Sequence, residues 1–130
     1  MAQIVINSIL VVFGLFFAYT AVASFRTPVP FARGLGLEPN GRSGAIEIRA
    51  QYGGFFAAAG IAQFAVFGGV ISAPAALFVG LVIFGGLIAG RGAAFLIGDK
   101  GEKLLPIISA LYWIDGVGCI AAVIGLFLAS

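Results

Sequence analysis

The chain of 130 residues contains no histidine, and this absence excludes more chemistry than any residue present suggests. Histidine is the commonest protein ligand for zinc and copper, a frequent ligand of haem iron, and the usual proton shuttle near neutral pH. The single cysteine, Cys119, lies in an apolar stretch and has no second cysteine with which to form an intramolecular disulfide. Such a cysteine usually behaves as a small hydrophobic side chain. We therefore expect no metal site, no cofactor and no catalytic residue.

Charged residues are also scarce. They make up 9% of the chain, whereas 62% of the residues are hydrophobic and the mean hydropathy is +1.16. A soluble domain carries about 25% charged residues, so the composition predicts a single integral membrane domain over residues 1–130. The net charge of +2 does not indicate a nucleic-acid partner. We expect the partners to be membrane lipids instead.

Four apolar stretches of the length needed to cross a bilayer predict an all-α bundle of four transmembrane helices. The predicted helices cover about residues 4–25, 45–71, 75–97 and 104–128. The first ends in an Ala-Val-Ala sequence at 21–23, which resembles a signal-peptidase site. A signal peptide carries basic residues before its apolar core, and no lysine or arginine precedes this stretch. We therefore expect the first helix to be retained.

All lysines and arginines cluster around two of the predicted loops. Four lie in or near the loop between the first and second stretches and three in or near the loop between the third and fourth: Arg26, Arg33, Arg42, Arg49, Arg91, Lys100 and Lys103. In a protein that crosses the membrane four times these loops share one side, and the positive-inside rule places them in the cytoplasm. We therefore expect both termini outside, in a bacterial inner membrane.

Small residues spaced four apart occur in three of the predicted helices. The pairs are Gly53–Ala57, Gly86–Gly90 and Gly118–Ala122. Such pairs let membrane helices approach closely. Packing within the bundle is the simpler interpretation, and a face kept for a protein partner or a second copy of the chain is the alternative.

Two arginines and one aspartate lie inside the predicted helices. At a rise of about 1.5 Å per residue, Arg49 lies about 6 Å and Arg91 about 9 Å from the cytoplasmic ends of their helices. Asp115 lies about 16 Å in, near the middle of the membrane. An aspartate is too short to reach the interface from that depth, so it needs a partner, and Arg49 or Arg91 could supply one.

Tyrosines share this layer: Tyr52 follows Arg49 by three residues and Tyr112 precedes Asp115 by three, so each pair lies on one helical face. Tyr19 is expected at a similar depth, about 9 Å from the end of its helix. The sequence thus predicts an intramembrane polar cluster of Glu47, Arg49, Tyr52, Arg91, Tyr112 and Asp115. This cluster is interpreted either as a clamp between helices or as a pocket for an anionic or amphipathic ligand.

The segment 47–54, with the sequence EIRAQYGG, resembles a motif that opens the second helix in a family of small bacterial membrane proteins. That family is the domain of unknown function numbered 4345. Further similarities are a Leu-Gly-Leu element at 35–37, an arginine after glycine at Gly90-Arg91, and the acidic Asp115. The resemblance implies a four-helix membrane fold and supplies no activity.

Three functions are consistent with these features. A non-catalytic accessory or assembly subunit of a larger membrane complex is the preferred hypothesis, and an enzyme is the least expected. A binding protein or carrier for a lipid, quinone or other amphipathic molecule is the first alternative. A proton or ion pathway through Asp115 is the second, with Gln63 and Asn7 as the polar residues of the outer half.

Overall fold

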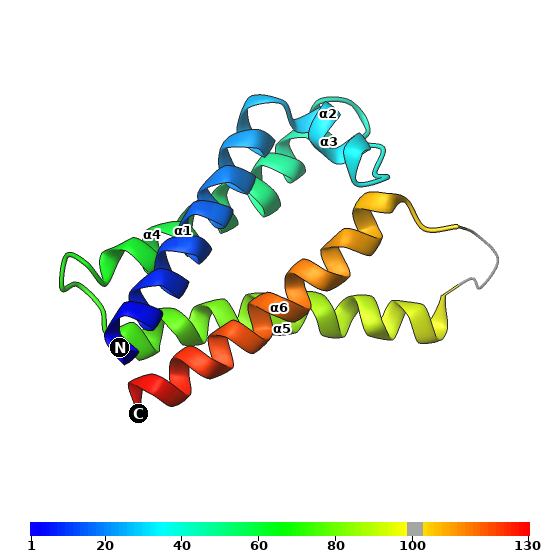
Figure 1. Cartoon of the computed structure of the whole chain (residues 1–130). Coiled ribbons are helices and arrows are strands. Elements are labelled where there is room, and N and C mark those ends of the chain that lie inside the picture. The colour runs from blue at the N-terminus through cyan, green and yellow to red at the C-terminus, as the bar shows by residue number, and fades with distance from the viewer. Residues whose placement is uncertain (99–102) are drawn as a thin grey trace.

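The computed structural model describes residues 1–98 and 103–130, and these are helical along most of their length (Figure 1). Three helices are long and apolar enough to cross a membrane: α1 (Ala2–Arg26), α5 (Ala73–Ile97) and α6 (Pro106–Ala129). Helices of this size are about 36 Å long or more, which exceeds a hydrocarbon core of about 30 Å. The all-α prediction and the predicted membrane-spanning character are confirmed at this level.

The helix predicted over 45–71 differs most from the structure. A continuous helical run from Gly41 to Ala65 takes its place, made of three segments: α3 (Gly41–Ile48), the π-helix η1 (Arg49–Gly54) and α4 (Phe55–Ala65). None of these segments is among the three candidate spans. The run ends early because Gly68 and Gly69 follow it, and Gly69 adopts a φ of 69° that ends helical geometry.

Proline and serine set several helix boundaries. Helix α1 ends before Thr27, whose φ of −134° and ψ of 67° lie outside the helical region that a following proline disfavours. Pro28 then opens the short helix α2 (Pro28–Gly34), and Pro106 opens α6. At the start of α5, the Ser72 hydroxyl accepts a hydrogen bond from the Ala75 N–H at 3.4 Å, which caps the helix.

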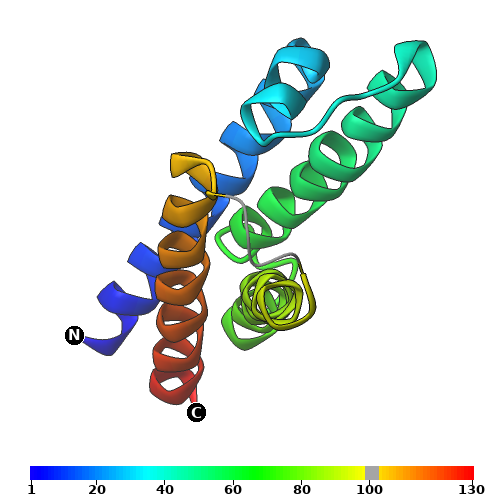
Figure 2. The same cartoon turned by 90° about the vertical axis from the view of Figure 1, so that its right-hand side faces the viewer.

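The helices form two antiparallel pairs. Helix α1 packs along α4 and η1, α5 packs along α6, and α1 also contacts α5 and α6. The two pairs diverge towards the end of the molecule that carries α2 and α3, while both chain termini lie at the opposite end (Figures 1 and 2). The chain therefore has a narrow end, where all the long helices meet, and a wider end.

Phenylalanine rings hold the two pairs together at their centre. Phe13 and Phe17 of α1 contact Phe84 of α5, with ring centroids 4.8 Å and 5.3 Å apart. Phe17 also contacts Phe56 of α4 at 5.7 Å. Aromatic pairs at such separations stabilise packing beyond the area that they bury, so one ring cluster joins α1, α4 and α5.

Several of these rings lie directly on glycine backbone. A Cβ added at these glycines would come within 2.6–2.7 Å of a ring atom, in the pairs Gly14–Phe64, Gly53–Phe25, Gly80–Phe13 and Gly118–Phe84. Only a residue without a side chain leaves space for the ring at this distance. The glycines thus serve as sockets for aromatic side chains as well as sites of close backbone approach.

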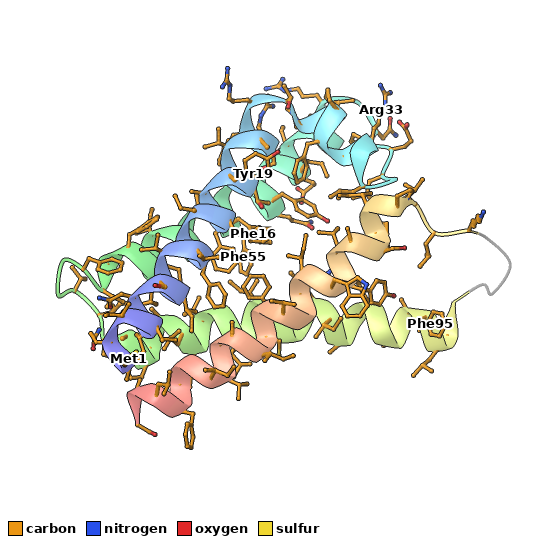
Figure 3. The ribbon with its side chains drawn as sticks, viewed as in Figure 1. Met1, Phe16, Tyr19, Arg33, Phe55 and Phe95 are labelled. Carbon is orange, nitrogen blue, oxygen red and sulfur yellow. The ribbon has the colours of Figure 1, made fainter. Side chains whose placement is uncertain are left out.

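Large apolar side chains also cover the outside of the molecule. Trp113, Phe127 and Phe95 are among the most exposed, and Phe95 projects outward near the end of α5 (Figure 3). Monomeric soluble proteins rarely expose apolar surface on this scale. The exposed surface is the kind that a lipid bilayer covers.

Candidate functional site

The candidate site is an ion pair between the two C-terminal helices. Arg91 lies in the second half of α5, and its Nη1 pairs with Oδ2 of Asp115 near the middle of α6. The Asp115 side chain is 1% exposed and that of Arg91 is 24% exposed. From the sequence, Arg49 and Arg91 were candidate partners for Asp115, and in the structure the partner is Arg91.

Tyr112 adds a second contact to the same arginine. Its hydroxyl donates a hydrogen bond of 2.8 Å to the backbone carbonyl of Arg91. Tyr112 precedes Asp115 by about one helical turn, so both side chains project from the same face of α6. Helix α6 therefore holds both the side chain and the main chain of Arg91.

The ion pair is the last of three successive contacts between α5 and α6. Leu77, Phe84 and Arg91 are spaced seven residues apart on α5, which puts them on one face of the helix. Their partners on α6 follow in reverse order: Gly125, Gly118 and Asp115. The first two layers place a bulky apolar side chain on glycine, and the third replaces that arrangement with opposite charges.

Tyr52 belongs to the other helix pair and lies on η1. Its ring is half-buried, 5.3 Å from Phe31 of α2 and stacked parallel to Phe56 at 6.3 Å. Direct contacts thus join three of the six predicted residues, Arg91, Tyr112 and Asp115. Tyr52 packs instead against aromatic rings of α2 and α4.

The other two predicted residues, Glu47 and Arg49, lie elsewhere. The Arg49 Nε donates a hydrogen bond of 3.1 Å to the Phe25 carbonyl, near the C-terminal end of α1. Glu47 is exposed and accepts a 3.4 Å hydrogen bond from Gln51. The predicted cluster is corrected accordingly. The physical reason is that η1 packs beside α1, where the last carbonyls of the helix need donors.

Tyr19 also departs from the prediction. It was expected beside the buried charges, and its side chain is 74% exposed on the outside of α1. The position of Tyr19 along α1 does not determine which face of the helix it occupies. Helix α1 is apolar on nearly every side, so the hydrophobic pattern does not show which face is buried.

Gln63 is a structural residue whose role the sequence did not reveal. Its side chain is fully buried, and Nε2 donates a 3.0 Å hydrogen bond to the Ala76 carbonyl in the first turn of α5. Among the described residues, Oε1 accepts no hydrogen bond. The signal that marks Gln63 is a lone amide in an apolar helix, a polar group that needs a partner when it is buried. The bond ties α4 to α5 at the narrow end of the molecule.

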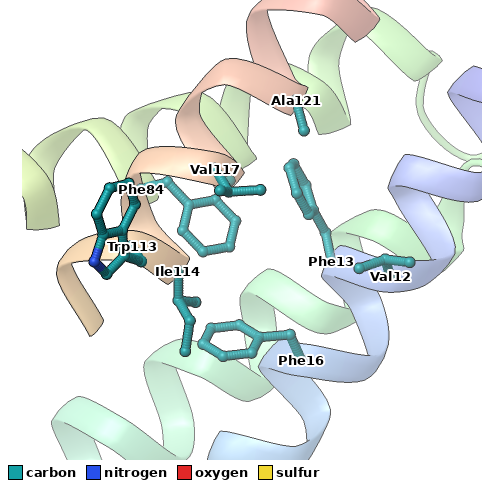
Figure 4. Close-up of a pocket in the computed structure, with 9 residues that line it drawn as sticks. Val12, Phe13, Phe16, Phe84, Trp113, Ile114, Val117 and Ala121 are labelled. Atoms are coloured by element: carbon teal, nitrogen blue, oxygen red, sulfur yellow. The ribbon is translucent and has the colours of Figure 1, made fainter. Parts of the chain in front are cut away.

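A shallow groove of about 360 Å³ lies between α1 and α6 (Figure 4). Apolar side chains from both helices form its walls: Val12, Phe13 and Phe16 of α1, and Trp113, Ile114, Val117 and Ala121 of α6. Phe84 of α5 also lines the groove. Neither Asp115 nor Arg91 does, although Ile114 is the neighbour of Asp115 in sequence. The groove and the ion pair are therefore separate features.

The chemistry of the site is electrostatic. A carboxylate and a guanidinium neutralise each other where a single charge would cost several kcal/mol, and a tyrosine hydroxyl fixes their geometry. Within the part of the chain that the structure describes, no group of three histidine, cysteine, aspartate or glutamate side chains gathers to hold a metal ion. The ion pair and the Tyr112 hydrogen bond both join α5 to α6.

Comparison with known proteins supplies no relative. No family model, no curated protein and no solved structure matches this chain. The resemblance of segment 47–54 to the domain of unknown function numbered 4345 stays a prediction.

Proposed function

We propose that the chain is a small integral protein of the bacterial inner membrane and serves as a non-catalytic accessory or assembly subunit of a larger membrane complex. In this proposal the chain works by offering helix surface to a protein partner. The ion pair, the ring cluster and the glycine sockets keep that surface in a constant shape.

We also propose that the helical run from Gly41 to Ala65 is the fourth crossing. It contains enough residues to cover about 30 Å of hydrocarbon. The positions of the termini support an even number of crossings, because both lie at one end of the molecule (Figure 1). The arginines of α1, α2 and α3 lie at the other end, which we assign to the cytoplasm.

The observation that carries the accessory-subunit proposal is an unfilled small-residue face on α5. Of the three small-residue pairs in the sequence, Gly118–Ala122 is buried inside the molecule and Gly53 receives the ring of Phe25. The third pair is different: apart from the adjoining residues and backbone of α5 itself, no described atom lies within 4 Å of a Cβ built at Gly86 or Gly90. Faces of this kind are where membrane helices associate.

The test is affinity capture of the full chain from native membranes in mild detergent, with quantitative mass spectrometry of the bound proteins. We expect one stoichiometric partner with the native chain. Replacing Gly86 and Gly90 by leucine should remove that partner without unfolding the chain, because open space surrounds both positions. Gly116→Leu on α6 is the matched control, since it also points into open space.

A monomer that captures no stoichiometric protein would contradict the proposal. So would a partner that the double leucine variant retains. The two alternative functions are less well supported, because both relied on access to the polar cluster. Asp115 is sealed against Arg91, which favours a clamp over a ligand pocket or a proton pathway.

A further inference from the structure

A continuous stripe of side chains runs along α1 from the groove to the arginine end of the molecule. Val12 and Phe16 line the groove, and Tyr19, Ala23 and Arg26 continue along the helix at alternating intervals of four and three residues. Residues spaced in this way lie on one helical face. Tyr19 and Arg26 are exposed along this stripe, so the path is open to the surroundings of the protein.

The stripe ends where positive charge gathers. Arg26 is the last residue of α1, and Arg49 donates a hydrogen bond to the neighbouring Phe25 carbonyl, which brings a second guanidinium to the same end of the helix. Arg33 is also nearby in sequence but is paired with Glu38 at 3.1 Å. Guanidinium groups bind phosphate oxygens through charge-assisted hydrogen bonds.

The distance between the charge and the groove matches one leaflet of a bilayer. Ten residues separate Phe16 from Arg26, which corresponds to about 15 Å along the helix. Half of a typical hydrocarbon core is also about 15 Å. When the guanidinium groups lie at the interface, the groove lies near the bilayer centre, where the end of an acyl chain would be.

We propose that this surface is a binding site for one anionic phospholipid of the leaflet next to the arginine end. The phosphate contacts Arg26, one acyl chain follows Tyr19 and Ala23 along α1, and its end fills the groove between α1 and α6. The site does not depend on the accessory-subunit proposal, because it uses a different face from Gly86 and Gly90.

Trp113 provides a direct measurement, since it lines the groove and is the only tryptophan of the chain. The purified full chain is reconstituted in mixed bilayers in which either an anionic phosphatidylglycerol or a zwitterionic phosphatidylcholine carries brominated acyl chains. Bromine quenches tryptophan fluorescence on contact. We expect the anionic lipid to be preferred about fivefold, the effect of one basic side chain at a charged membrane surface.

Two pairs of variants separate the bound lipid from the general lipid surroundings. Arg26→Gln should reduce the preference to nearly none, whereas Arg42→Gln, on α3 and off the stripe, should leave it unchanged. Ala121→Phe should fill the groove and lower quenching by the anionic lipid. Ile120→Phe, exposed and outside the groove, should not.

Native mass spectrometry of the same samples completes the test. A monomer that retains one anionic phospholipid, and loses it in the Arg26→Gln and Ala121→Phe variants, is the expected result. Equal quenching by the two lipids would overturn the proposal. A lipid-free dimer would also overturn it, because a second copy of the chain would then occupy the groove.

Discussion

At the scale of single residues, Asp115 depends on one partner. An isolated charge in the middle of a membrane costs about 2.5–3.5 kcal/mol on insertion scales, and the buried carboxylate avoids this cost through Arg91. The arginine in turn gains a carboxylate at a depth where water is scarce. Removing either residue alone leaves the other as an uncompensated charge.

We expect Asp115→Ala to lower the free energy of unfolding by about 3 kcal/mol, because the Arg91 guanidinium loses its carboxylate. Reversible unfolding of the purified chain in mixed micelles, followed by far-ultraviolet circular dichroism, measures the change. The double variant Arg91→Met/Asp115→Leu should recover most of the loss, since apolar pairs often replace buried ion pairs at little cost. A single variant as stable as the native chain would show that the pair is not a clamp.

A smaller effect is expected for the tyrosine that contacts the Arg91 backbone. Tyr112→Phe removes the hydroxyl that donates to the Arg91 carbonyl, and it should lower the free energy of unfolding by about 0.5–1.5 kcal/mol. Tyr19→Phe is the control, because Tyr19 is exposed on the outside of α1. Equal losses in the two variants would argue against a structural role for the Tyr112 hydrogen bond.

The sequence predicts a residue contact only where a side chain requires a partner and few residues can supply one. A mid-membrane aspartate must find a cation, so position along the helices was enough to name Arg91 as a candidate. Arg49 illustrates the limit, because its partner is a main-chain carbonyl at the end of α1. Every residue has such a carbonyl, so the sequence carries no signal for this bond.

At the scale of helices, glycine determines how closely elements pack. Gly118 receives the ring of Phe84, with a Cβ-to-ring distance of 2.6 Å for any added side chain, whereas Gly116 on the same helix faces open space. Both are glycines in the same apolar helix, but only Gly118 is packed against another side chain. Their comparison isolates packing from helix propensity.

We expect Gly118→Ala to lower the free energy of unfolding by about 1–3 kcal/mol, because the added methyl group displaces the Phe84 ring from the core. Gly116→Ala should leave stability unchanged or raise it by about 0.4–1 kcal/mol, through the lower entropy of the unfolded chain. Both are measured by the same unfolding titration. If the two substitutions had the same effect, the socket description of Gly118 would be wrong.

The helices that are hardest to predict are those whose geometry changes without a change in composition. A π-helical stretch such as η1 differs from α-helix by one residue in its hydrogen-bond spacing, and no amino acid marks it reliably. Arg49–Gly54 accordingly appeared from sequence to be ordinary helix. The early end of α4 is indicated in the sequence by Gly68-Gly69. The prediction of a helix over residues 45–71 gave more weight to the apolar composition than to these two glycines.

At the scale of the whole molecule, apolar length predicts helices but not their pairing. The long helices are apolar on almost all sides, so the hydrophobic pattern does not distinguish a face in contact with protein from one in contact with lipid. The pairing of α1 with α4 and of α5 with α6 follows from ring-in-glycine contacts that only three-dimensional placement reveals. The arginines of α1, α2 and α3, in contrast, distinguish one end of the molecule from the other, and they can be located in the sequence alone.

The orientation in the membrane and the fourth crossing can be tested together with two single-cysteine chains. In a Cys119→Ala background, Ser43→Cys and Val70→Cys place a thiol at exposed positions near the two ends of the helical run from Gly41 to Ala65. We expect a membrane-impermeant maleimide to label Val70→Cys in intact spheroplasts, and Ser43→Cys only after permeabilisation, because the arginine-rich end should stay in the cytoplasm. The reverse pattern would invert the orientation. Labelling of both thiols from the same side would mean that the run does not cross the membrane, and the chain would then have the three crossings of α1, α5 and α6 alone.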